Sequence, residues 1–259
     1  MNKAPIGFFD SGVGGTSIWK EVNALLPYEN TIYLADSKNA PYGPKGKERI
    51  IELSIKNTEF LLSRGCKLIV VPCNTATTNA IDILRANYKV RFIGIEPAIK
   101  PAALQTRTKV VGVLATKGTL SSSLFHKTSD IHANGIEVIE QVGEGLVPLI
   151  EVGEIDSPKM HNLLFTYMQP MIKANIDYLV LGCSHYPYLI PQLKDILPKT
   201  VKIIDSGEAV ARQTKSVLEK HALLNSSVIP GEHQFYSNTD TATLKSLLAK
   251  GLKVDHKDF

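Results

Sequence analysis

Short apolar runs, separated by longer segments with helical periodicity, recur along this chain. Two four-residue runs stand out, LIVV at residues 68–71 and YLVL at residues 178–181. Short, branched runs bounded by turn formers are typical of strands buried on both faces, as in a parallel sheet. Residues 48–64 instead carry apolar side chains at the spacing of an amphipathic helix. The pattern therefore predicts an α/β protein with largely parallel sheets.

Predicted strands and helices alternate over the first hundred residues. We expect strands at 5–9, 31–35, 68–71 and 92–95, and helices at 18–26, 48–64 and 80–87. Glu96 and Pro97 follow the last of these strands, and we interpret them as a crossing between two domains.

The alternation then starts again. We expect strands at 110–115, 136–139, 178–181 and 201–204, helices at 160–174, 208–220 and 241–250, an edge strand at 234–237 and a frayed end from 253. Asp10 and Cys73 are 63 positions apart, and Thr116 and Cys183 are 67 apart. These near-equal intervals predict two similar α/β domains, formed by residues 1–96 with 208–259 and by residues 97–207.

Composition and charge narrow the class of protein. The chain has 259 residues, 44% apolar and 21% charged, as in soluble globular proteins of one or two domains. Its net charge of +4 is spread over scattered lysines, so no nucleic-acid partner is expected. We also expect no membrane partner and a cytoplasmic location, because no apolar stretch reaches about 20 residues and no signal peptide is visible. The three cysteines match neither a disulfide framework nor a zinc site, so no metal is expected.

Two cysteines follow predicted strands directly. Cys73 follows the strand at 68–71 through Pro72, and Cys183 follows the strand at 178–181 through Gly182. Ligands of α/β sheets bind at the carboxyl ends of strands, where the N–H dipoles of the next helix lower the pKa of a thiol. A free cysteine is often only a small buried apolar residue. Two cysteines at equivalent places favour a functional role.

Other polar residues lie near these strand ends. The turn DSGVGGTS at residues 10–17 is typical of an anion cradle, but it lacks the GxGxxG spacing of a dinucleotide site. Asp10 either caps the next helix or orients a proton-transfer group. Tyr42 belongs to a turn that either covers a site or is ordinary, and Glu151 faces either solvent or the interior. His185, two residues after Cys183, either supports that thiol or is structural.

Two thiols from facing domains suit one type of chemistry. A site between two such domains would place one thiol on each side of a small substrate. One thiolate would remove a proton from carbon, and the opposite thiol would return a proton to the other face. The outcome is inversion of a stereocentre.

Four motifs carry a family resemblance over essentially the whole chain. They are FDSGVGG, ADSKNAPYG, VVPCNTAT and LGCSHYP, in this order. The chain resembles bacterial glutamate racemases. The resemblance implies an isomerase that needs no cofactor, has its site between two α/β domains, is commonly a homodimer, and supplies D-glutamate for peptidoglycan synthesis and hence cell-wall formation and cell shape.

The resemblance also implies roles for individual residues. Cys73 would be the base that acts on D-glutamate and Cys183 the base that acts on L-glutamate. Asp10, His185 and Glu151 would assist them. The predicted substrate-binding residues are Asp10, Ser11, Pro41, Tyr42, Gly43, Cys73, Asn74, Thr75, Cys183, Ser184 and His185. Ser184 occupies a position where the family usually has threonine, which keeps the hydroxyl group.

Three alternatives stay open at this stage. An aspartate racemase would differ by one methylene in its substrate. A thiol hydrolase could use Cys183 and His185 but would leave Cys73 and the glycine-rich turn without roles. A binding module that closes on an amino acid would leave both thiols unexplained.

Overall fold

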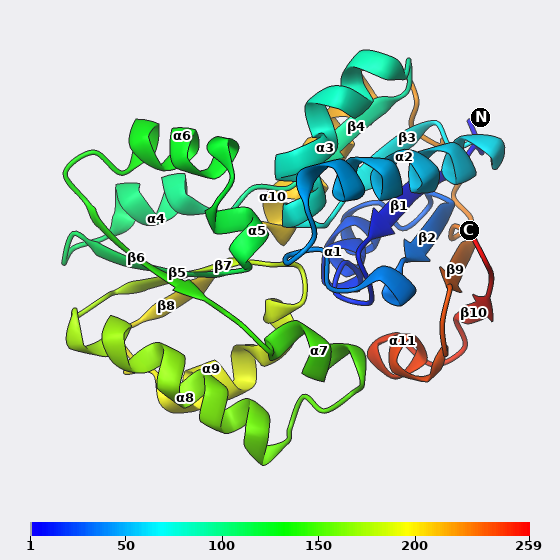
Figure 1. Ribbon diagram of the computed structural model, residues 1–259. Helices are drawn as coiled ribbons and strands as arrows, with labels where there is room; N and C mark the ends of the chain where they lie inside the picture. The colour runs from blue at the N-terminus through cyan, green and yellow to red at the C-terminus, as the bar shows by residue number, and fades with distance from the viewer. Residues whose placement is uncertain (1) are drawn as a thin grey trace.

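The computed structural model describes residues 2–259 and contains two parallel sheets. The strand order is β10-β9-β2-β1-β3-β4 in the six-stranded sheet and β6-β5-β7-β8 in the four-stranded sheet. Figure 1 shows the two sheets in separate lobes that lie side by side, with the chain termini in the larger one. The predicted fold class, α/β with two parallel sheets, is confirmed.

The first lobe contains the six-stranded sheet and the helices packed on it. Its strands are β1 (Ile6–Asp10), β2 (Thr31–Ala35), β3 (Leu68–Val71), β4 (Arg91–Gly94), β9 (His233–Ser237) and β10 (Lys253–His256). Its helices are α1 (Thr16–Leu25), the short η1 (Ser37–Asn39), α2 (Lys47–Ser63), α3 (Asn74–Asn87), α10 (Gly207–Lys220) and α11 (Ala242–Leu247).

Side chains alternate between the two faces of this sheet. Phe8 packs in the cluster that contains Ile18 of α1 and Leu218 of α10. Its neighbour Phe9 packs in the cluster that contains Leu61 of α2 and Leu84 of α3. Because both faces are covered, the central strands are apolar throughout, as the sequence pattern predicted.

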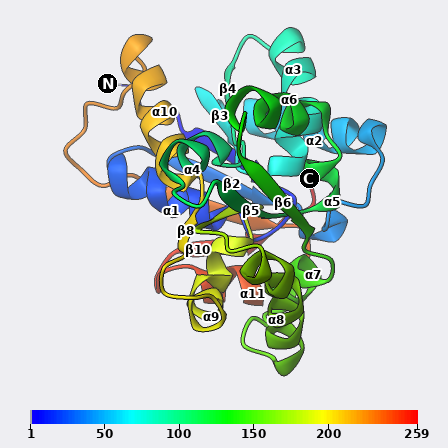
Figure 2. The same ribbon diagram turned by 90° about the vertical axis from the view of Figure 1, so that its left-hand side faces the viewer.

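The second lobe contains the four-stranded sheet. Its strands are β5 (Val110–Ala115), β6 (Glu137–Val142), β7 (Tyr178–Gly182) and β8 (Lys202–Ile204). Its helices are α4 (Ile99–Gln105), α5 (Lys117–Leu120), α6 (Ser123–His132), α7 (Leu146–Glu151), α8 (Pro158–Lys173), η2 (Tyr186–Leu189) and α9 (Ile190–Ile196). Helices α4 and α6 cover one face, while α8 and α9 cover the other (Figures 1 and 2).

The two sheets share a central arrangement. In the first lobe β1 pairs with β2 on one side and β3 on the other. In the second lobe β5 pairs in the same way with β6 and β7. Cys73 follows β3 and Cys183 follows β7, so the cysteines occupy corresponding places, as the spacing predicted.

The chain passes between the lobes at two places that touch. It leaves the six-stranded sheet after β4 and returns through α10. Ser206, which precedes α10, donates a hydrogen bond to the carbonyl of Glu96, which follows β4. The two predicted crossing points therefore lie next to each other.

Some predictions about single elements are wrong. Strand β9 is not at the edge, because it pairs with β2 and β10 on its two sides. The strand at this edge is β10, formed by residues that the charge pattern predicted to fray. Helix α3 begins at Asn74 rather than near residue 80, because its first turns are the polar residues that face the site. Helices α4, α5, α7 and α9 were not predicted.

Candidate active site

A small cavity lies between the lobes, at the carboxyl ends of β1, β3, β5 and β7. The volume open to the centre of a water molecule is about 10 Å³, which is close to the space that one water requires. The lining residues are Ser11, Pro41, Tyr42, Gly43, Cys73, Asn74, Thr75, Thr116, Val147, Gly182, Cys183, Ser184 and His185. Both predicted thiols therefore line one cavity, and each comes from a different lobe.

Cys73 lies at the N-terminus of α3. Its Sγ accepts a hydrogen bond from the Ala76 N–H at 3.3 Å, because Cys73 is the N-cap residue. The expectation that helix dipoles would lower the pKa of this thiol is wrong for this closed cavity. Burial, and then the nearby Asp10 carboxylate, raise the pKa of Cys73, and they outweigh the hydrogen bonds from Ala76 and Ser11. Cys73 is therefore held as a neutral thiol.

Cys183 is linked to an imidazole and a carboxylate. Its Sγ lies 3.7 Å from His185 Nδ1, and His185 Nε2 lies 2.5 Å from Glu151 Oε1. Burial alone would lower the pKa of His185, but hydrogen bonds and charge from Cys183 and Glu151 raise it well above its usual value. Burial would raise the pKa of Glu151, but its bonds to His185, Ser37 and Val13 lower it. His185 and Glu151 thus form a buried ion pair beside the thiol.

Asp10 lies behind the cavity rather than in its lining. It is fully buried at the end of β1, and Ser184 Oγ donates to its Oδ1 at 3.0 Å. Burial raises the pKa of Asp10, although His185 and Ser184 lower it in part. A carboxyl group with a raised pKa next to a buried thiol is suited to proton transfer.

Glu151 faces the interior and joins the lobes. Its carboxylate accepts hydrogen bonds from the Val13 N–H at 2.7 Å and from Ser37 Oγ at 2.7 Å, both in the first lobe. Glu151 itself ends α7 in the second lobe. The sequence left open whether Glu151 faces solvent or the interior. Its three partners, Val13, Ser37 and His185, show that it faces the interior.

Tyr42 is held by a buried network that sequence reasoning missed. Its hydroxyl donates to Asp36 Oδ2 at 2.5 Å and accepts from Asn57 Nδ2 at 3.2 Å. Asp36 Oδ1 also accepts from Asn238 Nδ2 at 2.6 Å. These bonds fix the loop that brings Pro41 and Gly43 to the cavity.

Thr116 was also missed as a cavity residue. Thr116 directly follows β5, and Asp10 ends β1, which is the corresponding strand of the other lobe. The internal repeat in the sequence was therefore a signal that Thr116 lies at the site. Its Oγ1 lies 2.9 Å from Oγ1 of Thr75 in the other lobe. Asn74 also lines the cavity, and its Oδ1 is buried and has no hydrogen-bond partner among residues 2–259.

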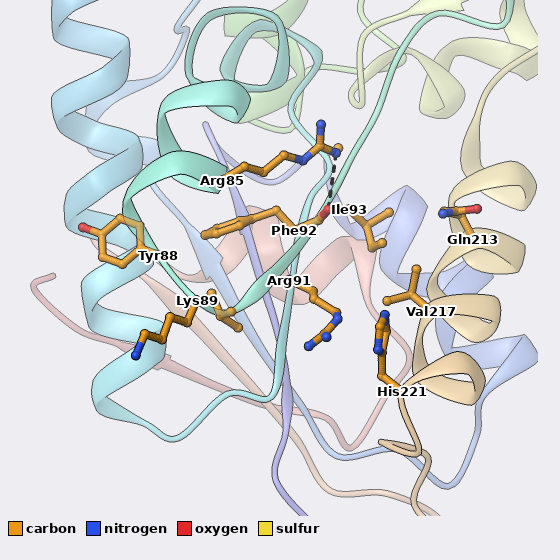
Figure 3. A pocket seen from close by; sticks show the side chains of 11 residues that line it. Arg85, Tyr88, Lys89, Arg91, Phe92, Ile93, Gln213, Val217 and His221 are labelled. Carbon is orange, nitrogen blue, oxygen red and sulfur yellow. Dashed lines mark hydrogen bonds between the residues drawn. The ribbon is translucent and has the colours of Figure 1, made fainter.

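Arginines lie away from this cavity. Arg49 pairs with Glu52 on the exposed face of α2. Arg85 donates to the Phe92 carbonyl in a cavity of about 460 Å³ between β4 and α10. Figure 3 shows Arg91 and His221 in that cavity, which contains neither a thiol nor a carboxylate. Within residues 2–259, no three His, Cys, Asp or Glu side chains are arranged as metal ligands.

Residues 15–214 match the family described as Asp/Glu/hydantoin racemase. The chain is 45% identical to the glutamate racemase of Herpetosiphon aurantiacus, over 93% of this chain and 95% of that protein. The chain belongs to the Asp/Glu racemase family and, within it, to the glutamate racemases. Among residues 2–259, no helix combines the length and apolar character that crossing a membrane requires.

Solved structures agree with this assignment. The Escherichia coli glutamate racemase in complex with L-glutamate and the activator UDP-MurNAc-Ala superposes with a TM-score of 0.86 at 32% identity, covering 98% of this chain and 97% of that chain. The Francisella tularensis glutamate racemase in complex with D-glutamate superposes with a TM-score of 0.85 at 28% identity, covering 100% and 98%.

Proposed function

We propose that this protein interconverts L- and D-glutamate by a two-thiol mechanism without a cofactor. The observation that carries the proposal is that Cys73 and Cys183 come from different lobes and line the same small cavity. A base on each side of one carbon is what inversion of a stereocentre requires. The similar proteins described above are glutamate racemases, which supports glutamate as the substrate.

In the proposed reaction, one thiolate takes the proton from the α-carbon, and the C–H bond becomes an S–H bond. The thiol on the other side then gives its own proton to the opposite face of the carbon. Cys73 would act as the base on D-glutamate and Cys183 on L-glutamate, as the family resemblance implies. Net atoms and charge are unchanged, so no further reactant is needed.

Neighbouring groups would assist both thiols. Asp10, with its raised pKa, is placed to exchange a proton with Cys73. The His185–Glu151 ion pair would keep a positive charge next to Cys183, where it attracts the negative charge that develops on the sulfur during proton transfer. The ammonium group of the substrate would lower the cost of a buried thiolate further.

Substrate binding would use neutral donors and acceptors. The free Oδ1 of Asn74 is available to accept from the ammonium group. The carboxylates would receive hydroxyl and backbone N–H donors from Ser11, Gly43, Thr75, Thr116 and Ser184, which line the cavity. No arginine lines this cavity, so we expect no arginine clamp on either carboxylate.

Racemisation by protein freed of metal and pyridoxal tests this proposal. L-Glutamate is incubated with the protein in D₂O, and optical rotation is followed together with deuterium at the α-carbon. We expect rotation to disappear while glutamate stays intact and gains deuterium. Unchanged rotation with intact glutamate would refute the proposal. Equal turnover of aspartate would favour the aspartate racemase alternative.

Several broader properties are part of the same proposal. We infer that residues 1–96 with 208–259 and residues 97–207 form two domains, and that the protein is a cytoplasmic homodimer that supplies D-glutamate for peptidoglycan. The three free cysteines support a reducing compartment. Growth of a bacterium that requires added D-glutamate, after expression of this chain, tests the cellular role. Sedimentation analysis tests the dimer.

A further inference from the structure

A second cavity lies directly outside the candidate active site. We call it the outer chamber; it has a volume of about 450 Å³ and is formed by residues 41, 43–44, 116–117, 142–145 and 147–148. Pro41, Gly43, Thr116 and Val147 line both this chamber and the inner cavity. The two spaces therefore share one wall, and a molecule that crossed this wall would pass from one to the other.

The shared wall is made where the lobes meet. Thr75 of the first lobe and Thr116 of the second have their Oγ1 atoms 2.9 Å apart. Close by, a Cβ added to Gly118 would lie 2.9 Å from the carbonyl oxygen of Gly43, so the two backbones are nearly in contact. Separation of the lobes would break this contact and open the wall.

The outer chamber carries two opposite charges that are not neutralised. Lys117 and Glu144 both line it and both are exposed. Within residues 2–259, neither side chain forms an ion pair, with each other or with a third group. Pro44, Val142 and Pro148 supply apolar surface between glycines. A free dicarboxylic amino acid has the matching features, namely two carboxylates, an ammonium group and an aliphatic chain.

We propose that the outer chamber is a capture site for a zwitterionic dicarboxylic amino acid. Lys117 binds a carboxylate and Glu144 faces the ammonium group before the Thr75–Thr116 wall opens. This inference rests on the proposed function and adds a binding step ahead of the chemistry. The closed inner cavity has almost no free volume, so substrate must wait outside until the wall opens. The rate at which substrate reaches the thiols therefore depends on how well the outer chamber captures it.

Charge reversal at Lys117 tests the proposal. Racemisation of L- and D-glutamate is measured for the wild-type protein, Lys117→Glu and the control Lys127→Glu, an exposed lysine on α6 with the same change in net charge. We expect Lys117→Glu to lower kcat/KM roughly three- to tenfold at low salt with kcat nearly unchanged, and high salt to reduce this difference. We expect Lys127→Glu to match the wild type.

The double variant Lys117→Glu/Glu144→Lys keeps one charge of each sign in the chamber. We expect it to recover most of the lost kcat/KM, which a general loss of folding would not allow. Equal kcat/KM for Lys117→Glu and Lys127→Glu would overturn the capture site. Absence of recovery would overturn the role of Glu144. A wild-type protein that fails to racemise glutamate would instead refute the proposed function itself.

Discussion

The Glu151 carboxylate accepts a hydrogen bond from the Val13 N–H at 2.7 Å, although the two residues belong to different lobes. The same oxygen, Oε1, lies 2.5 Å from Nε2 of His185, whose other nitrogen faces Cys183. Contact between the lobes is therefore coupled to the orientation of the imidazole beside one thiol. A change at Glu151 should affect lobe closure and proton transfer together.

Glu151→Gln should lower stability with a defined pH dependence. The pKa of His185 is raised above 6.5, so its contribution to the free energy of unfolding is complete below pH 6.5 and is lost as pH rises through the raised value. The pKa of Glu151 is lowered below 4.5, so its contribution is present above pH 4.5 and is lost as pH falls through the lowered value. We expect a maximal loss of about 1–3 kcal/mol between these limits.

Urea unfolding from about pH 4 to about pH 10 measures this difference. The exposed Glu154, three residues further on, provides the control Glu154→Gln, which should stay close to the wild type. A loss that did not depend on pH would show that the ion pair contributes through packing alone.

Each thiol should serve one face of the substrate. Cys73→Ser and Cys183→Ser should both abolish racemisation, because each removes one of the two bases. Elimination of chloride from a β-chloro analogue of glutamate needs only one base, so each variant should still react with one enantiomer. Chromatography of the elimination product shows which enantiomer each variant accepts.

Cys66→Ser is the matched control for both variants. Cys66 is buried beside Gly7 in the first lobe, and burial raises its pKa to about 12. It lies outside the cavity lining and should leave racemisation intact. If Cys73→Ser and Cys183→Ser accepted the same enantiomer, the assignment of one thiol to each face would be wrong.

Tyr42→Phe should loosen the loop that covers the cavity. The change leaves the buried Asp36 carboxylate without one donor, and such a loss costs about 1–3 kcal/mol of unfolding free energy. We also expect KM to rise, since Gly43 is positioned by the same loop. Tyr88→Phe removes a hydroxyl whose bond to Glu59 is exposed and should change stability by less than about 0.5 kcal/mol. Equal effects of the two changes would contradict the positioning role of Asp36.

Gly118→Ala should keep the shared wall from closing. The new methyl group would meet the Gly43 carbonyl oxygen and Thr75 Cγ2, each at 2.9 Å, so the lobes could not approach as they do now. We expect kcat to fall more than tenfold, since incomplete closure admits water to the thiols. At Gly46 an added Cβ has no neighbour closer than 3.7 Å, so Gly46→Ala should retain activity. Measurement of kcat for Gly118→Ala and Gly46→Ala by steady-state kinetics tests this difference.

Local patterns were enough to predict the central strands and the position of both cysteines at strand ends. The runs before Cys73 and Cys183 are apolar because their strands are covered on both faces, and that environment leaves a direct signature in the sequence. The order of β9 and β10 left no such signature, because both strands are short and mixed in polarity, and β9 pairs with β2, which is distant in the sequence. Position at an edge is a property of the assembled sheet.

Residues behind the cavity were harder to predict than residues in its lining. Asp36 appears in sequence as an ordinary turn residue, and only the packing of Tyr42, Asn57 and Asn238 around it shows that its carboxylate is buried. Glu151 is one glutamate at a helix end, where exposure is the default. Its inward orientation depends on Val13 and Ser37, which are far away in sequence.

The size of the closed cavity leads to a prediction about substrate length. Its volume of about 10 Å³ does not admit an amino acid, so the lobes must separate and then close around the substrate. Glutamate should reach donors on both lobes, whereas aspartate should fall short by one methylene. That difference is worth roughly 1 kcal/mol in packing, with a further loss if a polar group stays unpaired. We therefore expect a strong preference for glutamate, expressed in kcat more than in KM.

Kinetics on both amino acids and small-angle scattering test this argument together. Separation should occur near Glu96 and Ser206, where the two crossings of the chain are joined by a hydrogen bond. We expect added glutamate to reduce the radius of gyration and aspartate to reduce it less, because the shorter chain holds the lobes together less well. Comparable kcat for aspartate would show that closure does not depend on substrate length. An unchanged scattering profile with glutamate would indicate a rigid site, and the selectivity would then have to come from the fixed positions of Asn74, Thr116 and Ser184.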